Sequence, residues 1–256
     1  MKFKLVILLS FAILSELSAQ VEIYSPALPF TRHVNSRYYE KSPVLHPSGE
    51  QLFFVRANDP ANVGGITDQG DIWMSRLDST GNWLPPKNLG KVINNNGKNT
   101  IIGFLNEGRY MLIAEQYGKA RYTPRGIAIS EFRNDEWQTP QNIDIPYFDK
   151  KSNHLTGSVT ADGEVLLLSM ESFGSYGVED LYISERSKNG DWKGLVNLGK
   201  AINSEFQEIS GFLTTDGKQL IFASNRKSGI GSFDLWVADR TGNSWKKWSD
   251  PVLLSD

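Results

Sequence analysis

Short apolar runs bounded by turn residues recur along the chain after residue 41. The clearest unit has two apolar runs around the pair Asp216-Gly217, a third alternating run at residues 233–238, and a fourth segment marked by Trp245. An Asp-Gly pair between hydrophobic runs favours a hairpin, because the turn needs a positive φ that glycine adopts without steric cost. We therefore predict a four-stranded antiparallel sheet.

This unit occurs four times, and two independent landmarks recur every 53 to 59 residues. They are the turn glycines Gly49, Gly108, Gly163 and Gly217 and the late tryptophans Trp83, Trp137, Trp192 and Trp245. A repeat of that length with four strands is typical of a β-propeller blade, and stacked neighbours bury the faces that one blade leaves open. We expect an all-β fold, a β-propeller of four recognisable four-stranded blades, with repeats at about 42–94, 95–149, 150–203 and 204–256.

The first residues have the pattern of an export signal. Lys2 and Lys4 precede an apolar run at residues 5–14, and small residues offer a cleavage point after Ala19. The run is too short to cross a bilayer, so it predicts a signal peptide over residues 1–19 and not a membrane span; we expect no transmembrane segment elsewhere. Residues 20–41 form a polar lead-in segment without a full unit, and one role for it is a strand that closes the ring.

Composition narrows the functional classes. The chain has no cysteine, which excludes disulfides, thiol chemistry and cysteine-based metal sites. Its 27 basic and 29 acidic residues nearly balance, so nucleic acid and anionic membrane surfaces are not expected partners. Most of the seven tryptophans fall in or beside predicted strands, which favours a packing role.

Several motifs are similar to a known repeat. The segments 214–217 (Thr-Thr-Asp-Gly), 223–226 (Ala-Ser-Asn-Arg) and 234–237 (Asp-Leu-Trp-Val) resemble the PD40, or WD40-like, repeats of TolB-type propellers. The Asn-Leu-Gly…Ile-Asn segments at 88–94 and 197–203 resemble the N-terminal propeller of Bacteroidetes OmpA-family outer-membrane proteins. This resemblance implies a location in the periplasm or at the outer membrane.

The sequence departs from that family pattern because it holds four units and no OmpA-like domain. Three arrangements stay open: a closed four-bladed ring, an incomplete ring that a partner chain completes, and a shortened relative of a longer OmpA-type protein.

Catalytic and metal-binding patterns are not found. His33, His46 and His154 belong to no zinc-protease motif, and no G-x-S-x-G segment occurs, so we expect no metal and no cofactor. A sialidase repeat would need Ser-x-Asp-x-Gly-x-Thr-Trp, whereas the Asp and Gly of these turns are adjacent. An aspartate recurs just before the third strand of three units, and its repetition favours a turn cap over a ring of acids; the residues are Asp71, Asp180 and Asp234.

The loops after each second strand should lie on one rim of the propeller. Arginine and tyrosine on loops held by a rigid scaffold are typical of a recognition surface, although an ordinary polar rim is the plainer interpretation. The candidate binding residues are Arg56, Tyr117, Arg121, Tyr122, Glu171, Tyr176, Asn225 and Arg226.

Together these patterns favour an exported, non-catalytic propeller that serves as a protein–protein interaction platform in the cell envelope, associated with the outer membrane. Its expected partners are envelope or outer-membrane proteins, with glycan or peptidoglycan as further candidates. The alternative is a carbohydrate-binding or glycan-cleaving propeller, with a glycoside hydrolase as the enzyme class.

Overall fold

The computed structural model describes residues 30–114, 117 and 126–254. Residues Thr31–Asp256 form one compact unit. The predicted signal peptide and residues 20–29 of the lead-in segment lie outside the described residues. No helix in the described part of the chain is long and apolar enough to cross a membrane.

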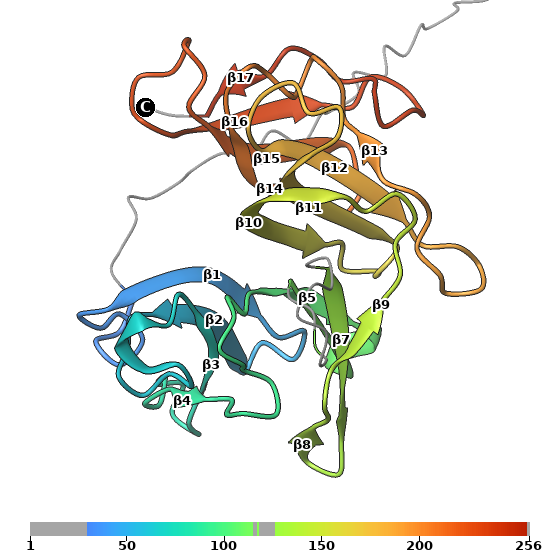
Figure 1. The fold of residues 1–256 in the computed structure, drawn as a ribbon. Helices are drawn as coiled ribbons and strands as arrows, with labels where there is room; N and C mark the ends of the chain where they lie inside the picture. The colour runs from blue at the N-terminus through green and yellow to red at the C-terminus, as the bar shows by residue number, and fades with distance from the viewer. Residues whose placement is uncertain (1–29, 115–116, 118–125, 255–256) are drawn as a thin grey trace, which may run out of the picture. The chain divides into compact units, whose positions relative to one another are not determined.

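Four sheets follow one another along the chain, as Figure 1 shows. The first contains β1 (Tyr39–Leu45), β2 (Gln51–Ala57), β3 (Asp71–Arg76) and β4 (Lys87–Asn88), and the second contains β5 (Ile101–Leu105), β6 (Tyr110–Ile113), β7 (Ile127–Arg133), β8 (Glu136–Trp137) and β9 (Gln141–Ile143). The third contains β10 (Lys150–Val159), β11 (Val165–Ser172), β12 (Asp180–Glu185) and β13 (Val196–Asn197), and the fourth contains β14 (Glu208–Leu213), β15 (Gln219–Ser224), β16 (Asp234–Asp239) and β17 (Val252–Leu253). Two 3-10 turns complete the elements, η1 (Gly65–Thr67) and η2 (Asn106–Gly108).

The strands of each sheet are antiparallel, and all except β9 pair with their neighbours in chain order, so the predicted all-β propeller of four blades is confirmed. The second sheet is the irregular one. Both β8 and β9 pair with β7, where β9 takes the place of the fourth strand and β8 extends a hairpin at the other end of β7.

The hairpins between first and second strands form where the Asp-Gly pairs predict them. Gly163 and Gly217 have positive φ values of 74° and 65°. The carboxylate of Asp216 accepts hydrogen bonds from the Thr214 hydroxyl and the Lys218 N–H, and these bonds lower its pKa. The acid therefore fixes the turn while glycine supplies the left-handed backbone.

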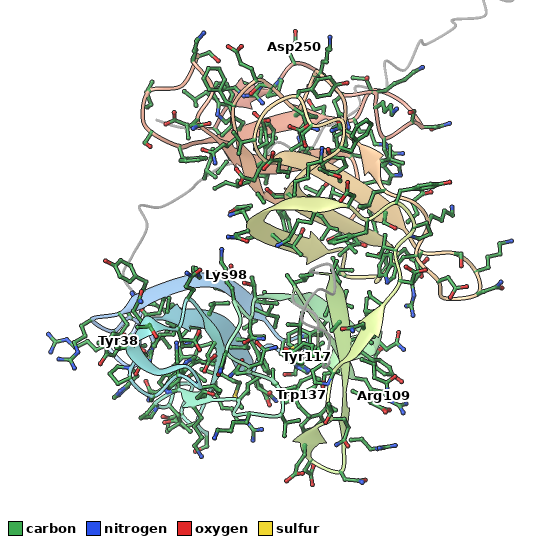
Figure 2. All side chains as sticks on the ribbon, viewed as in Figure 1. Tyr38, Lys98, Arg109, Tyr117, Trp137 and Asp250 are labelled. Carbon is green, nitrogen blue, oxygen red and sulfur yellow. The ribbon has the colours of Figure 1, made fainter. Side chains whose placement is uncertain are left out.

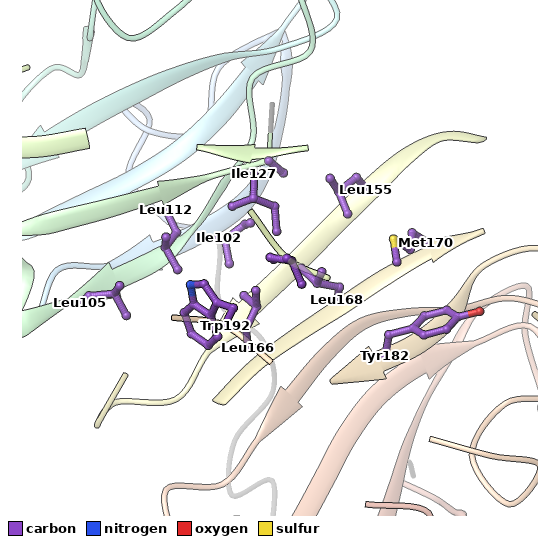
Figure 3. Close-up of a cluster of buried hydrophobic side chains, with 12 residues drawn as sticks. Ile102, Leu105, Leu112, Ile127, Leu155, Leu166, Leu168, Met170, Tyr182 and Trp192 are labelled. Atoms are coloured by element: carbon purple, nitrogen blue, oxygen red, sulfur yellow. The ribbon is translucent and has the colours of Figure 1, made fainter. Parts of the chain in front are cut away.

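Each sheet buries its apolar faces against the next sheet. One core joins the first and second sheets through Phe53, Ile72 and Met111. The core in Figure 3 joins the second and third sheets, with Leu112 and Ile127 packed against Leu166 and Leu168. The third core joins the last two sheets and includes Leu167, Leu181, Ile183, Leu220, Phe222 and Trp236.

No packing of comparable extent joins the first sheet to the fourth in the described part of the chain, whereas β5 contacts β1 and β10, and β14 contacts β11. The propeller ring is therefore open.

A buried asparagine ties each of two blade exits back to its own sheet. The amide of Asn203 accepts the Leu181 N–H at 2.8 Å and donates to the Leu181 carbonyl at 3.0 Å. Asn94 makes the same two bonds with Ile72. This clamp secures β3 and β12 on the edge that the short fourth strands leave partly unpaired.

The lead-in segment has the same local structure as the blade exit around Asn203, which the sequence did not indicate. The N–H groups of Val34 and Asn35 bond to the Thr31 carbonyl, as those of Ile202 and Asn203 bond to Gly199. The Ser36 hydroxyl then donates to Glu40, as Ser204 does to Glu208. Residues 31–40 thus have the structure of residues 199–208, although only three of their side chains are identical, Asn35, Ser36 and Glu40.

In the fourth sheet, a different tryptophan occupies the position equivalent to Trp83 and Trp192. Trp83 and Trp192 each form a β-bridge to the residue after the third strand, but the equivalent bridge is made by Trp248 and not by Trp245. Trp248 is buried in the last core, while the Arg240 guanidinium lies 3.6 Å from the Trp245 ring centroid. The regular spacing of Trp245 therefore does not mark the equivalent position.

We expect the Asn203→Ala variant to lower the free energy of unfolding by about 1–3 kcal/mol, because it leaves the buried Leu181 N–H and carbonyl without these partners. Urea unfolding followed by tryptophan fluorescence measures this loss. Asn189→Ala, at an exposed turn, is the matched control and should change stability by less than about 0.5 kcal/mol. Equal effects of the two variants would contradict the clamp.

Candidate functional site

In each sheet, the end of the second strand lies at the same edge as the starts of the first and third strands. The end of β2 pairs with the starts of β1 and β3, and the corresponding strands of the other sheets pair alike. The loops between second and third strands therefore share this end, which we call the loop rim: residues 58–70, 114–126, 173–179 and 225–233. Of the second loop only residues 114, 117 and 126 are described.

The recurring aspartates cap these loops, as the sequence predicts. Asp180 accepts the N–H groups of Tyr176 and Gly177 at 2.9 and 3.2 Å, together with the Asn197 amide at 2.7 Å. Asp71 accepts the Val63 N–H at 2.7 Å. Burial raises the pKa of both Asp71 and Asp180 against these hydrogen bonds. Asp234 accepts N–H groups of its own loop in the same manner.

Arg56 lies inside the first sheet and not on its surface. Its guanidinium pairs with Glu40 at 2.8 Å and donates to the Val34 carbonyl at 3.1 Å. The guanidinium carbon is 4.6 Å from the Trp73 ring centroid and 5.4 Å from that of Phe54. A buried arginine with an acid, a carbonyl and two aromatic faces is fully engaged in holding the lead-in turn to the sheet.

Arg226 makes the same set of contacts in the fourth sheet from a different position in the sequence. It pairs with Glu208 at 3.2 Å, donates to the Ile202 carbonyl, and lies 5.1 Å from the Trp236 and Phe222 ring centroids. Glu208 is the counterpart of Glu40, but Arg226 follows the strand whereas Arg56 lies within it. Burial lowers the pKa of Arg226, and Glu208 opposes that change.

Two further candidates are also bound to the framework. The Tyr117 hydroxyl donates to the Ile93 carbonyl and accepts from the Asn99 amide at 3.0 Å. Asn225 and Gln207 join across the sheet, since the Asn225 oxygen accepts the Gln207 N–H at 2.9 Å.

The remaining candidates have different places. Tyr176 is exposed on the loop rim, where the Lys200 ammonium lies 5.7 Å from its ring centroid. Glu171 is half-buried near the end of β11. Arg121 and Tyr122 lie outside the described residues.

The described loops present a feature that sequence reasoning missed, namely exposed apolar side chains. Phe173 is 82% exposed, and five further large apolar side chains of these loops are exposed with it. The sequence led us to expect charged and tyrosine side chains on this rim, whereas the signal that identifies it is large apolar residues in loop positions. The set is Ile66, Phe173, Tyr176, Val178, Ile230 and Phe233.

A polar cavity of about 320 Å³ opens among the first strands at the same end. Its lining comes from the first loop, from the connection before β5 and from the start of β10, and includes Gln69, Lys98, Lys150 and Asn153. Lys98 is labelled in Figure 2. Nearby Lys41 donates to the Gln69 carbonyl at 3.0 Å, and its pKa is lowered by burial and by the charge of Lys98.

His154 lies next to this lysine cluster. Burial lowers its pKa, the Glu179 carboxylate opposes that change, and the positive charges of Lys98, Lys150 and Lys41 add to it. Its Nε2 is buried without a hydrogen-bond partner in the described part of the chain. The ring is thus held in its neutral form within a positively charged neighbourhood.

The other histidines have simple positions. His33 is exposed, and His46 lies in the first hairpin with its ring centroid 4.9 Å from that of Phe104. Among residues 30–114, 117 and 126–254, no group of three or more His, Asp or Glu side chains is arranged to hold a metal ion.

Comparisons with known proteins give similarity in fold only. No family model and no curated protein matches the chain. Similar solved structures include TolB from Acinetobacter baumannii, with 18% identity and a TM-score of 0.49 over 81% of this chain and 42% of that chain. The putative TolB from Agrobacterium tumefaciens has 11% identity and a TM-score of 0.47 over 86% and 82%. A puromycin-hydrolyzing peptidase from Mycobacterium tuberculosis has 14% identity and a TM-score of 0.44 over 79% and 28%.

The chain therefore spans less than half the length of the Acinetobacter TolB that it matches.

We expect Arg226→Ala to destabilise the protein by about 3–5 kcal/mol, because Glu208 would stay buried without its cation. Neighbouring Lys227 pairs with Glu205 at the exposed surface, so Lys227→Ala should cost less than about 1 kcal/mol. Chemical denaturation of both variants measures the difference. A stable Arg226→Ala protein that loses partner binding would instead assign this arginine to recognition.

His154 predicts a pH dependence of stability. Its folded pKa lies below the usual 6.5, so on acidification the unfolded chain takes up the proton first and stability is lost as the pH falls below about 6.5. Between pH 7 and 5, we expect the free energy of unfolding to fall less for His154→Gln than for the wild type. Above pH 7.5, the free energy of unfolding should depend on pH in the same way for both proteins. His33→Gln, at an exposed site, should follow the wild-type curve.

Proposed function

We propose that this protein is an exported, non-catalytic interaction platform of the cell envelope, associated with the outer membrane, which binds a protein partner through its loop rim. The observation that carries this proposal is the set of exposed apolar side chains on loops that the aspartate caps hold in place. Large apolar and aromatic side chains on rigid loops are the groups that contribute most to protein–protein binding.

The framework contacts support this division of roles. Arg56, Arg226 and Asn225 are committed to the sheets, which leaves Phe173, Tyr176 and their apolar neighbours to meet a partner. The envelope location rests on the pattern of residues 1–19 and on the resemblance of the repeats to propellers of Bacteroidetes OmpA-family proteins. Peptidoglycan or outer-membrane proteins are the corresponding candidates for what the platform contacts.

A second candidate function follows from the polar cavity. Amide and ammonium groups around a cavity of this size suit a polar ligand such as a glycan. This alternative requires binding of soluble oligosaccharides by the purified protein.

We expect tagged protein, crosslinked in native envelopes and purified, to retain a distinct outer-membrane or peptidoglycan-associated protein. Phe173→Asp should reduce that recovery at least tenfold, because it places a charge in the apolar part of the interface. Quantitative mass spectrometry of the recovered proteins is the measurement.

Leu84→Asp is the matched control, since Leu84 is exposed in the connection after β3, at the opposite end of the sheets. Its recovery should equal that of the wild type. If no partner depends on Phe173, and oligosaccharides bind the purified protein, the glycan alternative replaces the platform.

A further inference from the structure

The last sheet has an apolar face that the other sheets bury. Leu235 in β16 is 45% exposed, whereas its counterparts at the start of the third strand, Ile72 and Leu181, are fully buried at 0%. Each counterpart is covered by the following sheet, as the cores between sheets show. Leu235 therefore marks the position where a following sheet would pack.

The exposed face continues across the sheet around Leu235. Phe212 and Val252 are both exposed, and they pair across the strands with half-buried Ile221 and Val237. Cross-strand partners point to the same side of a sheet. The face is thus a continuous apolar surface that runs from β14 to β17.

The corresponding face of the first sheet is only partly open, because Leu52, Phe54 and Trp73 are buried there with Val34 of the lead-in segment. Leu45, at the end of β1, is 54% exposed, but Leu213 at the same position of the fourth sheet is only 4% exposed because the third sheet covers it. Leu45 pairs with Leu52, as Leu213 pairs with Leu220. The side of the first sheet that would face a preceding sheet is therefore uncovered at Leu45.

The lead-in turn indicates how these two faces fit together. Asn94 and Asn203 are each 1% exposed and clamp the third strand of the sheet that precedes their turn, whereas Asn35 occupies the same place in its turn and is exposed. In a complete array, the third strand of the sheet before this turn would place Leu235, or its equivalent, next to Asn35. Asn88 and Asn197, in the fourth strands of their sheets, donate hydrogen bonds to Asp71 and Asp180. The last sheet has Leu253 at this position, so an apolar side chain replaces the amide there.

We propose that the apolar face of β14–β17 binds the first sheet of a second copy of this chain, with Asn35 of that copy clamping the backbone of Leu235. The contact repeats an interface that the chain already builds between its successive sheets, so its chemistry is present on both sides. The chain's own first sheet does not cover the face. Two such contacts, related by a twofold axis, close a ring of two chains and cover Leu235 and Leu45 in both copies.

This proposal goes beyond the loop rim, because it assigns self-association to the sheet faces. Sedimentation velocity of the purified protein over micromolar concentrations tests it. We expect a dimer for the wild type and monomers for Leu235→Asp and for Leu45→Asp, each with wild-type circular dichroism. Tyr147→Asp, at an exposed position between β9 and β10 of the middle sheets, should remain a dimer.

A mixing experiment gives the sharpest signature. Leu235→Asp keeps an intact first sheet and Leu45→Asp keeps an intact last sheet, so an equimolar mixture should form a heterodimer through one undamaged contact although each variant alone is monomeric. A monomeric wild type at all concentrations would overturn the proposal. A wild-type dimer that survives Leu235→Asp, or variants that fail to pair when mixed, would overturn the head-to-tail contact.

Discussion

The packing of one sheet face against the next is the interaction on which this structure depends. A four-stranded sheet buries only one face at a time against a single neighbour, so each sheet needs two neighbours to remove its apolar side chains from water. Three such cores hold the array together, and each is built from equivalent strand positions. The stability of any one sheet is consequently tied to the sheets beside it. Of the two terminal faces, the first is largely covered by the lead-in segment around Val34, and the last leaves Leu235 exposed.

Polar side chains in the array serve mainly to fix loops and exits. Asp180 holds its loop, Asn203 holds the exit from the third sheet, and Arg226 joins the next sheet to that exit through Glu208. The side chains of the described loops that the framework does not use are largely apolar.

Arg56 and Arg226 show that two sheets can form the same set of contacts from different positions in the repeat. Both arginines meet a glutamate, an exit carbonyl and two aromatic faces, although one lies within the second strand and the other follows it. A long, flexible side chain reaches the same pocket from either place. Both were predicted as rim residues because they follow the apolar run of the second strand, but β2 extends over Arg56 and Arg226 turns back onto its sheet.

The sequence by itself determined the sheet architecture, because turn glycines, alternating apolar runs and capping aspartates are local signals that fix strands and hairpins. It also indicated the loop that each of Asp71, Asp180 and Asp234 would cap. The burial of Arg56, the bridge made by Trp248 and the match between residues 31–40 and 199–208 were decided only by tertiary structure. Each depends on which side chains meet across sheets distant in sequence, and no local pattern specifies such a meeting.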